Sequence, residues 1–401
     1  MAALRGQVTR LIINSGRRSI RSYTVASSFR YNDLKVTLTD DPQPKPPTDK
    51  LVFGHHFTDH MLEVAWSKEG GWKAPEIVPV HEFKMHPAAK VLHYATELFE
   101  GIKAFRCVDN KIRIFRPIEN MKRMNRSAER SALPTFDSVE LIKCISKLVS
   151  IDSEWVPYSK DCSLYLRPTL IGTDPTLGVT VSNTALLYVL LGPVGPYFPT
   201  GLKPITLLAD PQYVRAWPGS CGEYKMGSNY GPTIAIQDKA LKENNAQQVL
   251  WLFGPDHQLT EVGTMNLFMY WINEKGEDEL ITAPLDGLIL PAATGMSLLD
   301  LAREWGEFKV TEDRYNMKQL LKALQEGRVK EIFGAGTAST VCPVDKILYN
   351  NQVLEIPTMK EAKLTNRFMS VLTDIQLGRK PHEWMLDVDD VEEDEKMGMK
   401  A

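Results

Sequence analysis

A single lysine stands in a glycine-rich stretch that runs from Gly219 to Thr233. Two tyrosines, Tyr224 and Tyr230, flank this lysine, Lys225, and glycines occupy positions 219, 222, 227 and 231. Glycine at this density lets the backbone pass close to a bound group. A partly desolvated amine, steered by neighbouring polar groups, can form a Schiff base with a carbonyl compound. Taken alone, such a stretch is more often a surface turn that carries one solvated lysine.

A lysine that binds pyridoxal phosphate needs further groups: an acid at the pyridine nitrogen, a donor at the phenolic oxygen, and cations and amides for the phosphate. Glu261 stands beside a glycine at the entrance to the apolar strand predicted at 267–272. Residues 288–294 precede a helix predicted from Ser297, and the free amides of a helix start attract phosphate. Residues 333–340 add glycines and hydroxyls after another predicted strand. Each segment is also compatible with an ordinary turn.

Other chemistries have less support. Neither G-x-G-x-x-G nor a P-loop motif occurs, so nucleotide binding is not indicated. Five cysteines without a C-x-x-C pair fit a reducing compartment, and the scattered His and Cys predict no metal site. A net charge of -3 argues against general nucleic-acid binding. No apolar run approaches the roughly 20 residues of a membrane helix, so no membrane partner is expected.

Strands and helices alternate on both sides of one clear break, which predicts an α/β protein of two domains. The break, 192–201, contains three prolines and three glycines. Helices are predicted at 119–132, from Asp137, at 233–244, 297–305, 317–326 and 361–377. Strands are predicted at 165–171, 185–191, 205–209, 249–253, 267–272, 280–282 and 329–333.

The two ends of the chain differ in charge from the rest. Residues 1–30 contain six arginines and no acid, which is typical of a mitochondrial transit peptide, and seven of the nine residues 387–395 are acidic. The predicted organisation is a transit peptide at 1–30, a linker at 31–50, a small α/β domain at 51–191, an interdomain loop at 192–204, a large cofactor-binding α/β domain at 205–386 and a disordered acidic tail at 387–401.

Four motifs together carry a resemblance to a known family. They are Phe99-Glu-Gly-Ile-Lys-Ala-Phe105, Ser163-Leu-Tyr-Leu-Arg-Pro168, Tyr224-Lys-Met-Gly-Ser-Asn-Tyr-Gly231 and Leu259-Thr-Glu-Val-Gly-Thr-Met-Asn266. The chain closely resembles the branched-chain amino acid aminotransferases over roughly residues 47–385, and their animal mitochondrial members most of all. The resemblance implies the type IV fold of pyridoxal phosphate enzymes, with the cofactor between two α/β domains, a homodimer and a location in the mitochondrial matrix.

The resemblance also implies roles for particular residues. Lys225 would bind the cofactor covalently and later carry a proton. The remaining cofactor contacts implied are Glu261 at the pyridine nitrogen, Tyr230 at the phenolic oxygen, and Arg123, Ala293, Thr294 and Thr337 at the phosphate. The substrate contacts implied are an aromatic wall of Phe53, Tyr94, Phe99, Tyr165 and Tyr197, Val179 from a loop of the partner subunit, Arg167 for the distal carboxylate of glutamate, and Thr264 and the amide of Ala338 for the α-carboxylate.

The chain departs from the family pattern at three positions. Ala292 and Gly295 replace a glycine and an arginine of the phosphate loop, and Ser339 replaces the first cysteine of a redox pair, so that only Cys342 remains. Alanine at a position that needs a positive φ would cost about 1–2 kcal/mol. We expect retained activity with weaker cofactor affinity, and no dithiol switch at Cys342.

The expected activity is transamination of L-leucine, L-isoleucine and L-valine with 2-oxoglutarate by a ping-pong mechanism. Two other classes of function stay open at this point. A D-amino acid aminotransferase or aminodeoxychorismate lyase would share Lys225, Glu261 and Arg123 but need another pocket. A non-catalytic binding protein of the same fold would follow if Ala292 and Gly295 abolished cofactor binding.

Overall fold

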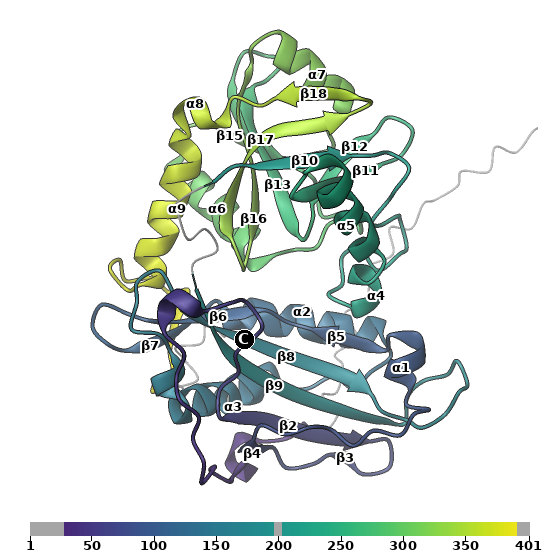
Figure 1. Ribbon diagram of the computed structural model, residues 1–401, viewed down its shortest axis with the longest axis vertical. Helices are drawn as coiled ribbons and strands as arrows, with labels where there is room; N and C mark the ends of the chain where they lie inside the picture. The colour runs from purple at the N-terminus through teal and green to yellow at the C-terminus, as the bar shows by residue number, and fades with distance from the viewer. Residues whose placement is uncertain (1–27, 196–202, 391–401) are drawn as a thin grey trace, which may run out of the picture.

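The chain forms two lobes, each built around one sheet (Figure 1). The computed structural model describes residues 28–195 and 203–390. The predicted substrate residue Tyr197 lies outside these ranges, as do almost all of the predicted transit peptide and most of the predicted acidic tail. Among the described residues, no helix is long and apolar enough to cross a membrane.

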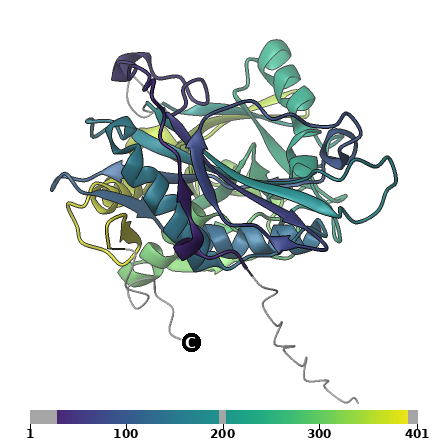
Figure 2. The same cartoon turned by 90° about the horizontal axis from the view of Figure 1, so that it is seen from below.

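The first lobe contains a ten-stranded sheet in the order β1-β4-β2-β9-β8-β6-β7-β19, with β3 paired to β2 and β5 paired to β8. Its strands are β1 (Lys35–Val36), β2 (His60–Ser67), β3 (Gly71–Trp72), β4 (Glu76–Pro79), β5 (Glu97–Phe99), β6 (Ile102–Arg106), β7 (Ile112–Phe115), β8 (Ser163–Gly172), β9 (Thr184–Val194) and β19 (Met385–Asp387). Part of the predicted linker therefore forms β1 at the edge of this sheet. Figure 2 shows these purple and teal strands side by side across the molecule.

The strand β9 continues past the predicted end at residue 191. Proline at 193 was expected to stop it, because proline cannot donate to a ladder. However, β2 pairs with β9 only through Val189, so beyond that point only β8 pairs with it, at Pro193 through Leu164. Proline is tolerated where one side of a strand has no ladder.

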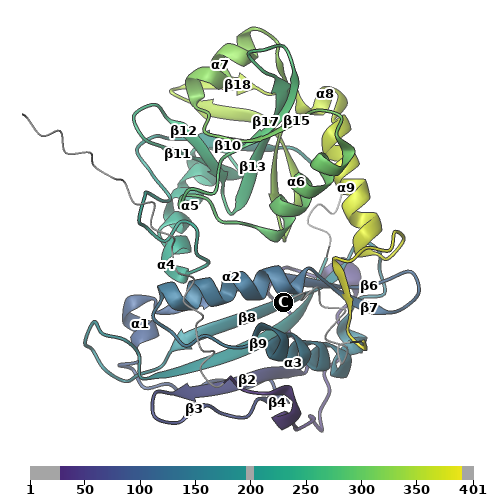
Figure 3. The ribbon, with the colours of Figure 1, turned by 180° about the vertical axis from the view of Figure 1, so that it is seen from behind.

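Helices cover one side of this sheet (Figure 3). They are α1 (Lys90–Tyr94), α2 (Pro117–Arg130) and α3 (Ser138–Ile151), and short 3-10 turns occur at Tyr31–Asp33, Thr48–Lys50 and Ser153–Trp155. Met121, Met124 and Ala128 form the buried stripe of α2, as their spacing predicts. Asp137 caps α3 as expected, but Glu140 accepts from the backbone N–H of Tyr31 instead of closing a capping box.

The second lobe contains a nine-stranded sheet in the order β12-β11-β10-β17-β16-β13-β14-β15, with β18 paired to β17. Its strands are β10 (Ile205–Ala209), β11 (Gln248–Phe253), β12 (Gln258–Val262), β13 (Met265–Ile272), β14 (Asp278–Thr282), β15 (Lys309–Glu312), β16 (Val329–Gly336), β17 (Thr340–Tyr349) and β18 (Gln352–Glu355). Its helices are α4 (Gly227–Tyr230), α5 (Thr233–Asn244), α6 (Ala293–Trp305), α7 (Met317–Gln325), α8 (Thr358–Glu361) and α9 (Lys363–Gln376).

Two helices of this lobe begin at residues other than those predicted. α6 begins at Ala293 and not at Ser297, whose hydroxyl instead donates to the Ala293 carbonyl. The predicted helix 361–377 begins only at Lys363, because Ala362 adopts a left-handed conformation between α8 and α9.

More than one segment of the chain connects the two lobes. Phe105 and Phe115 of the first lobe belong to the same buried cluster as Phe368 and Leu372 of α9. After α9 the chain returns to the first sheet, where β19 pairs antiparallel with β7. The two sheets therefore do not divide the sequence at a single point.

Candidate active site

The backbone of Lys225 is fixed by the first lobe. Its N–H donates to the Ser127 hydroxyl on α2 at 3.0 Å, and its carbonyl accepts from the Phe99 N–H at 3.0 Å. The next residue, Met226, forms a β-bridge with Leu98 of β5. The glycine-rich stretch thus leaves β10 in the second lobe and lies against β5, so that Lys225 stands between the two lobes.

The ammonium of Lys225 lies between two aromatic rings. It donates to the Tyr230 hydroxyl at 2.8 Å and lies 4.6 Å from the centre of the Phe99 ring. Burial, followed by the neighbouring Arg123 charge, lowers the pKa of Lys225 to about 8. Burial also raises the pKa of Tyr230, which keeps its hydroxyl protonated. An amine with this pKa is available as a nucleophile and as a base near neutral pH.

Glu261, near the end of β12, is buried and has three polar partners. One oxygen accepts from the Leu290 N–H at 2.7 Å and from the Asn266 amide at 3.3 Å, and the other pairs with Arg215 at 2.9 Å. Burial raises the pKa of Glu261, while the Arg215 charge acts in the opposite direction. The carboxylate is thus held in one orientation within range of the Lys225 charge.

Arg123 joins α2 to the loop that precedes α6. Two of its nitrogens donate to the buried Glu100 carboxylate at 2.8 and 2.6 Å, and a third donates to the Pro291 carbonyl at 2.9 Å. No side chain caps the start of α6, so its first amides are available to an anion. The N-cap, Ala292, has a φ of -85°, which alanine adopts without strain. The conformational cost considered for alanine at this position therefore does not arise.

The predicted aromatic wall follows one face of the first sheet. Phe53 contacts Tyr165 edge-on with ring centres 4.9 Å apart. The Arg167 guanidinium lies 4.8 Å from the Phe99 ring centre and donates to the Tyr165 hydroxyl at 3.1 Å. Phe99 in turn lies 4.9 Å from the Tyr230 ring centre. A chain of contacts therefore runs from the predicted substrate residues to Lys225.

Several predicted residues lie apart from this chain of contacts. The Tyr94 hydroxyl donates to the carbonyl of Leu177 in the loop that carries Val179, and the Val179 side chain is 84% exposed. Thr264 is exposed at the turn between β12 and β13, where its carbonyl lies beside Gly336. The predicted residues Thr337 and Ala338 lie in the next turn, between β16 and β17.

Three charged residues of the site were not predicted from the sequence. Glu100 holds Arg123, Arg215 holds Glu261, and Lys103 donates to the Ala338 carbonyl at 3.0 Å. Glu100 and Lys103 both lie in the first quoted motif, where an acid and a base among apolar residues were the available signal. Nothing in the sequence around Arg215 indicates its role.

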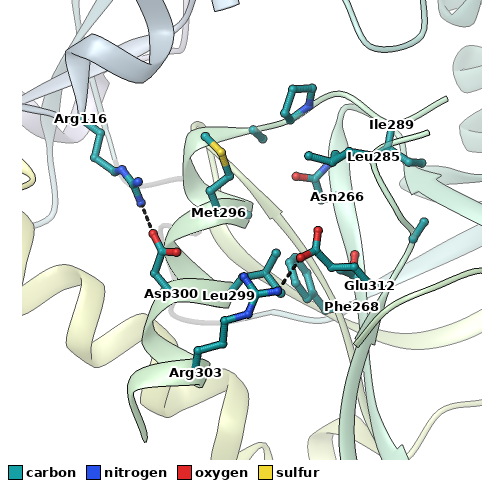
Figure 4. A pocket seen from close by; sticks show the side chains of 15 residues that line it. Arg116, Asn266, Phe268, Leu285, Ile289, Met296, Leu299, Asp300, Arg303 and Glu312 are labelled. Carbon is teal, nitrogen blue, oxygen red and sulfur yellow. Dashed lines mark hydrogen bonds and ion pairs between the residues drawn. The ribbon is translucent and has the colours of Figure 1, made fainter. Parts of the chain in front are cut away.

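A separate cavity of about 260 Å³ lies beside the first turns of α6 (Figure 4). Its lining includes two ion pairs, one between Arg116 and Asp300 and one between Arg303 and Glu312. Gly295 lines the cavity, and a Cβ at this position would overlap the Asn266 amide oxygen. Since Lys225, Tyr230 and Glu261 do not line it, this cavity is not the candidate active site.

Comparison with known proteins identifies the class. The family model "Amino-transferase class IV" matches residues 97–347. A branched-chain aminotransferase structure from Thermobaculum terrenum, in its PLP form, superposes with a TM-score of 0.66 at 17% identity, covering 83% of this chain and 99% of that one. The structure of the branched-chain amino acid aminotransferase from Escherichia coli gives a TM-score of 0.64 at 22% identity, with 82% and 99% covered. The chain belongs to the class IV aminotransferases.

Curated relatives identify the family within this class to which the chain belongs. The cytosolic branched-chain-amino-acid aminotransferase of Mus musculus is 57% identical over 92% of this chain and 95% of its own length. The mitochondrial enzyme of Rattus norvegicus is 52% identical over 96% of this chain and all of its own. Within its class, the chain therefore belongs to the branched-chain-amino-acid aminotransferases.

Pyridoxal 5'-phosphate is the cofactor of this class, and the residues present fit it. The donor set matches the chemistry of the group: a desolvated amine, a protonated phenol, a buried carboxylate for the pyridine nitrogen, and uncapped amides with Arg123 for the phosphate.

The lowered pKa of Lys225 predicts a pH-dependent stability of the cofactor-free protein. Between pH 8 and about 10.5 the folded state has lost this proton while the unfolded state keeps it, so the free energy of unfolding rises with pH. We expect cofactor-free Lys225→Met to unfold at a higher temperature than the wild-type protein at pH 7. The difference should shrink as the pH approaches 10, as measured by thermal unfolding at several pH values. A difference independent of pH would contradict a desolvated ammonium.

Proposed function

We propose that this protein transfers the amino group of L-leucine, L-isoleucine or L-valine to 2-oxoglutarate in a ping-pong reaction. The observation that carries this proposal is the row of contacts from Phe53, Tyr165 and Arg167 through Phe99 to Lys225. Aromatic rings suit a branched hydrocarbon, and one cation among them suits the distal carboxylate of glutamate. A single pocket can thus serve both half-reactions.

Pyridoxal phosphate, when bound, supplies a ring that stabilises negative charge at the substrate's Cα. We assign to the chain the tasks of binding, orientation and proton transfer. With the cofactor bound, Lys225 Nζ would carry the proton from the substrate's Cα to the cofactor's C4′, and in the opposite direction in the second half-reaction, for which a pKa near neutrality is suited. Glu261, oriented by Arg215 and Asn266, pairs with the pyridine nitrogen, and Tyr230 donates to the phenolic oxygen. Arg123, the amides of Ala293 and Thr294, and Thr337 bind the phosphate.

The substrate's α-carboxylate would be held at the adjacent turns of the second lobe. Thr264 and the amide of Ala338 come from the two loops that lie side by side at Gly336. The contact of the Ala338 carbonyl with Lys103, which lies opposite Tyr165 in the first sheet, supports this assignment. Tyr94 and Tyr197 complete the proposed aromatic wall.

The proposed activity is tested by absorbance of the purified protein. We expect a cofactor band in the near ultraviolet to visible range that is lost on addition of L-leucine and restored by 2-oxoglutarate. Lys225→Ala should keep the fold and lower turnover by several orders of magnitude, because base and nucleophile are lost together. Lys122→Ala, at an exposed lysine of α2 that pairs with Glu119, is the matched control. A band bleached by D-alanine but not by leucine would refute the proposal.

We also propose a homodimer in which the loop at 175–181 contributes Val179 to the partner's site. Leu177, Val179 and Val181 are 64%, 84% and 61% exposed, which is an unusual concentration of apolar side chains on one loop. Tyr94 and the buried Lys90 fix this loop through Leu177, Gly178 and Thr180.

Because the proposed dimer completes the site, one substitution in this loop should change both the oligomeric state and the KM for leucine. Val179→Asp should shift the mass in analytical ultracentrifugation toward the monomer and raise the KM for leucine. Lys84→Asp, on a polar exposed stretch of the same lobe, should change neither quantity. A monomeric wild-type protein with full activity would contradict the proposal.

We propose a mitochondrial location, supported by the six arginines and absent acids of residues 1–30. The relatives named above include one cytosolic and one mitochondrial enzyme. The full chain fused to a fluorescent protein should enter mitochondria, and removal of residues 1–30 should leave it in the cytosol. Cytosolic fluorescence of the full-length fusion would refute the assignment.

A further inference from the structure

Lys103 connects the two lobes at the candidate active site. It lies in β6 of the first sheet, and its ammonium donates to the carbonyl of Ala338 in the β16–β17 turn of the second lobe. The same turn contains the proposed phosphate and α-carboxylate contacts. An ammonium has three donors, and within the described residues this single carbonyl is its hydrogen-bond partner.

The strand register places Lys103 on the substrate face of the sheet. Lys103 pairs directly with Tyr165 across β6 and β8, and directly opposed residues of an antiparallel pair share one face. Arg167 lies two residues further along β8 and therefore also points to this face. A Cβ at Gly101 would overlap the Tyr165 hydroxyl, so the phenol lies over this glycine. Lys103, Tyr165 and Arg167 thus form one row.

Neither cation in this row has an acidic partner among the described residues. Lys103 forms no ion pair there, and burial lowers its pKa to about 8. Arg167 bonds only to the Tyr165 hydroxyl, and its Nε is buried without a partner. The two buried acids nearby, Glu100 and Glu261, are already occupied by Arg123 and Arg215.

Withdrawing a cation from water without a counter-charge is costly, and buried charges are normally paired. Lys103 and Arg167 are both partly buried, and two cations on one face without a counter-charge among the described residues indicate an anionic ligand between or beside them. A carboxylate has two oxygens and can accept from both cations at once. The hydrocarbon side chain of a branched-chain substrate offers no such acceptor, and the α-carboxylate common to all the substrates is already assigned to Thr264 and the amide of Ala338.

We propose that Lys103 binds the side-chain carboxylate of the dicarboxylate substrates, beside Arg167, and so sets the affinity of the site for glutamate and 2-oxoglutarate. This assignment rests on the proposed function and adds a second cation to it. With a branched-chain substrate, the flexible lysine keeps its bond to the Ala338 carbonyl. With a dicarboxylate, its free donors turn to the distal carboxylate.

The test compares two classes of ligand on the holoenzyme. Lys103→Met keeps the volume of the side chain and removes its charge. We expect the KM for 2-oxoglutarate and glutamate to rise about ten- to hundredfold, as for a lost charge-assisted hydrogen bond. The KM for leucine should change by less than about threefold. Lys103→Arg should restore much of the dicarboxylate affinity, and Lys346→Met, at a partly exposed strand lysine paired with Glu355, should behave as wild type.

Unreactive ligands make the result independent of turnover. Calorimetry should show weakened binding of glutarate to Lys103→Met and unchanged binding of 4-methylpentanoate. Should the methionine variant fail to retain the cofactor, Lys103→Gln, which can still donate to Ala338, allows the same comparison. An equal rise for both ligand classes, or no change for either, would overturn the proposal. A wild-type protein that binds glutarate but does not transaminate leucine would refute the proposed function and leave this contact standing.

Discussion

The removal of the Lys225 ammonium from water is the constraint on which the site depends. Phe99 and Tyr230 shield it, and its backbone is bonded to both β5 and α2. Desolvation alone would favour an amine that escapes to the surface, so its position has to be fixed by the surrounding structure. The glycines at 222 and 227 permit this close packing, because a side chain at either would overlap neighbouring atoms, at 227 those of Glu97. The fold thus creates a reactive amine by holding it where charge is disfavoured.

The other buried charges between the lobes are also held in fixed positions by the surrounding structure. Glu261 and Arg123 are buried, yet each has a partner that fixes its orientation, Arg215 in one case and Glu100 in the other. Buried pairs of this kind contribute little net stability, and here each arginine holds its carboxylate in one orientation. The two cations left without acidic partners among the described residues, Lys103 and Arg167, lie on the face that we assign to substrate. The pattern of satisfied and unsatisfied charge therefore separates groups that position the cofactor from groups available to a ligand.

The sequence predicted the α/β class, most of the long elements and the family, because apolar periodicity and local motifs carry that information. α5 was predicted at its observed bounds, and Asp137 was recognised as a cap. The prediction was wrong where tertiary context decides. Ser297 has the residue type of a helix cap but lies inside α6, and Pro193 continues β9 because one side of the strand has no partner there. Arg215 could not be found, since its role follows from a contact with a residue 46 positions away. Sequence reasoning also could not show that Ala292 is unstrained, which required its φ angle.

The pairing of β19 with β7 has a consequence for biosynthesis. Residues 385–387 complete the edge of a sheet whose other strands all lie before residue 195. While the chain is being synthesised, β7 keeps an open edge until residues 385–387 have been translated, and an open edge is a template for mispairing with other chains. A nascent chain whose synthesis has not reached β19 therefore exposes the edge of β7 to such mispairing.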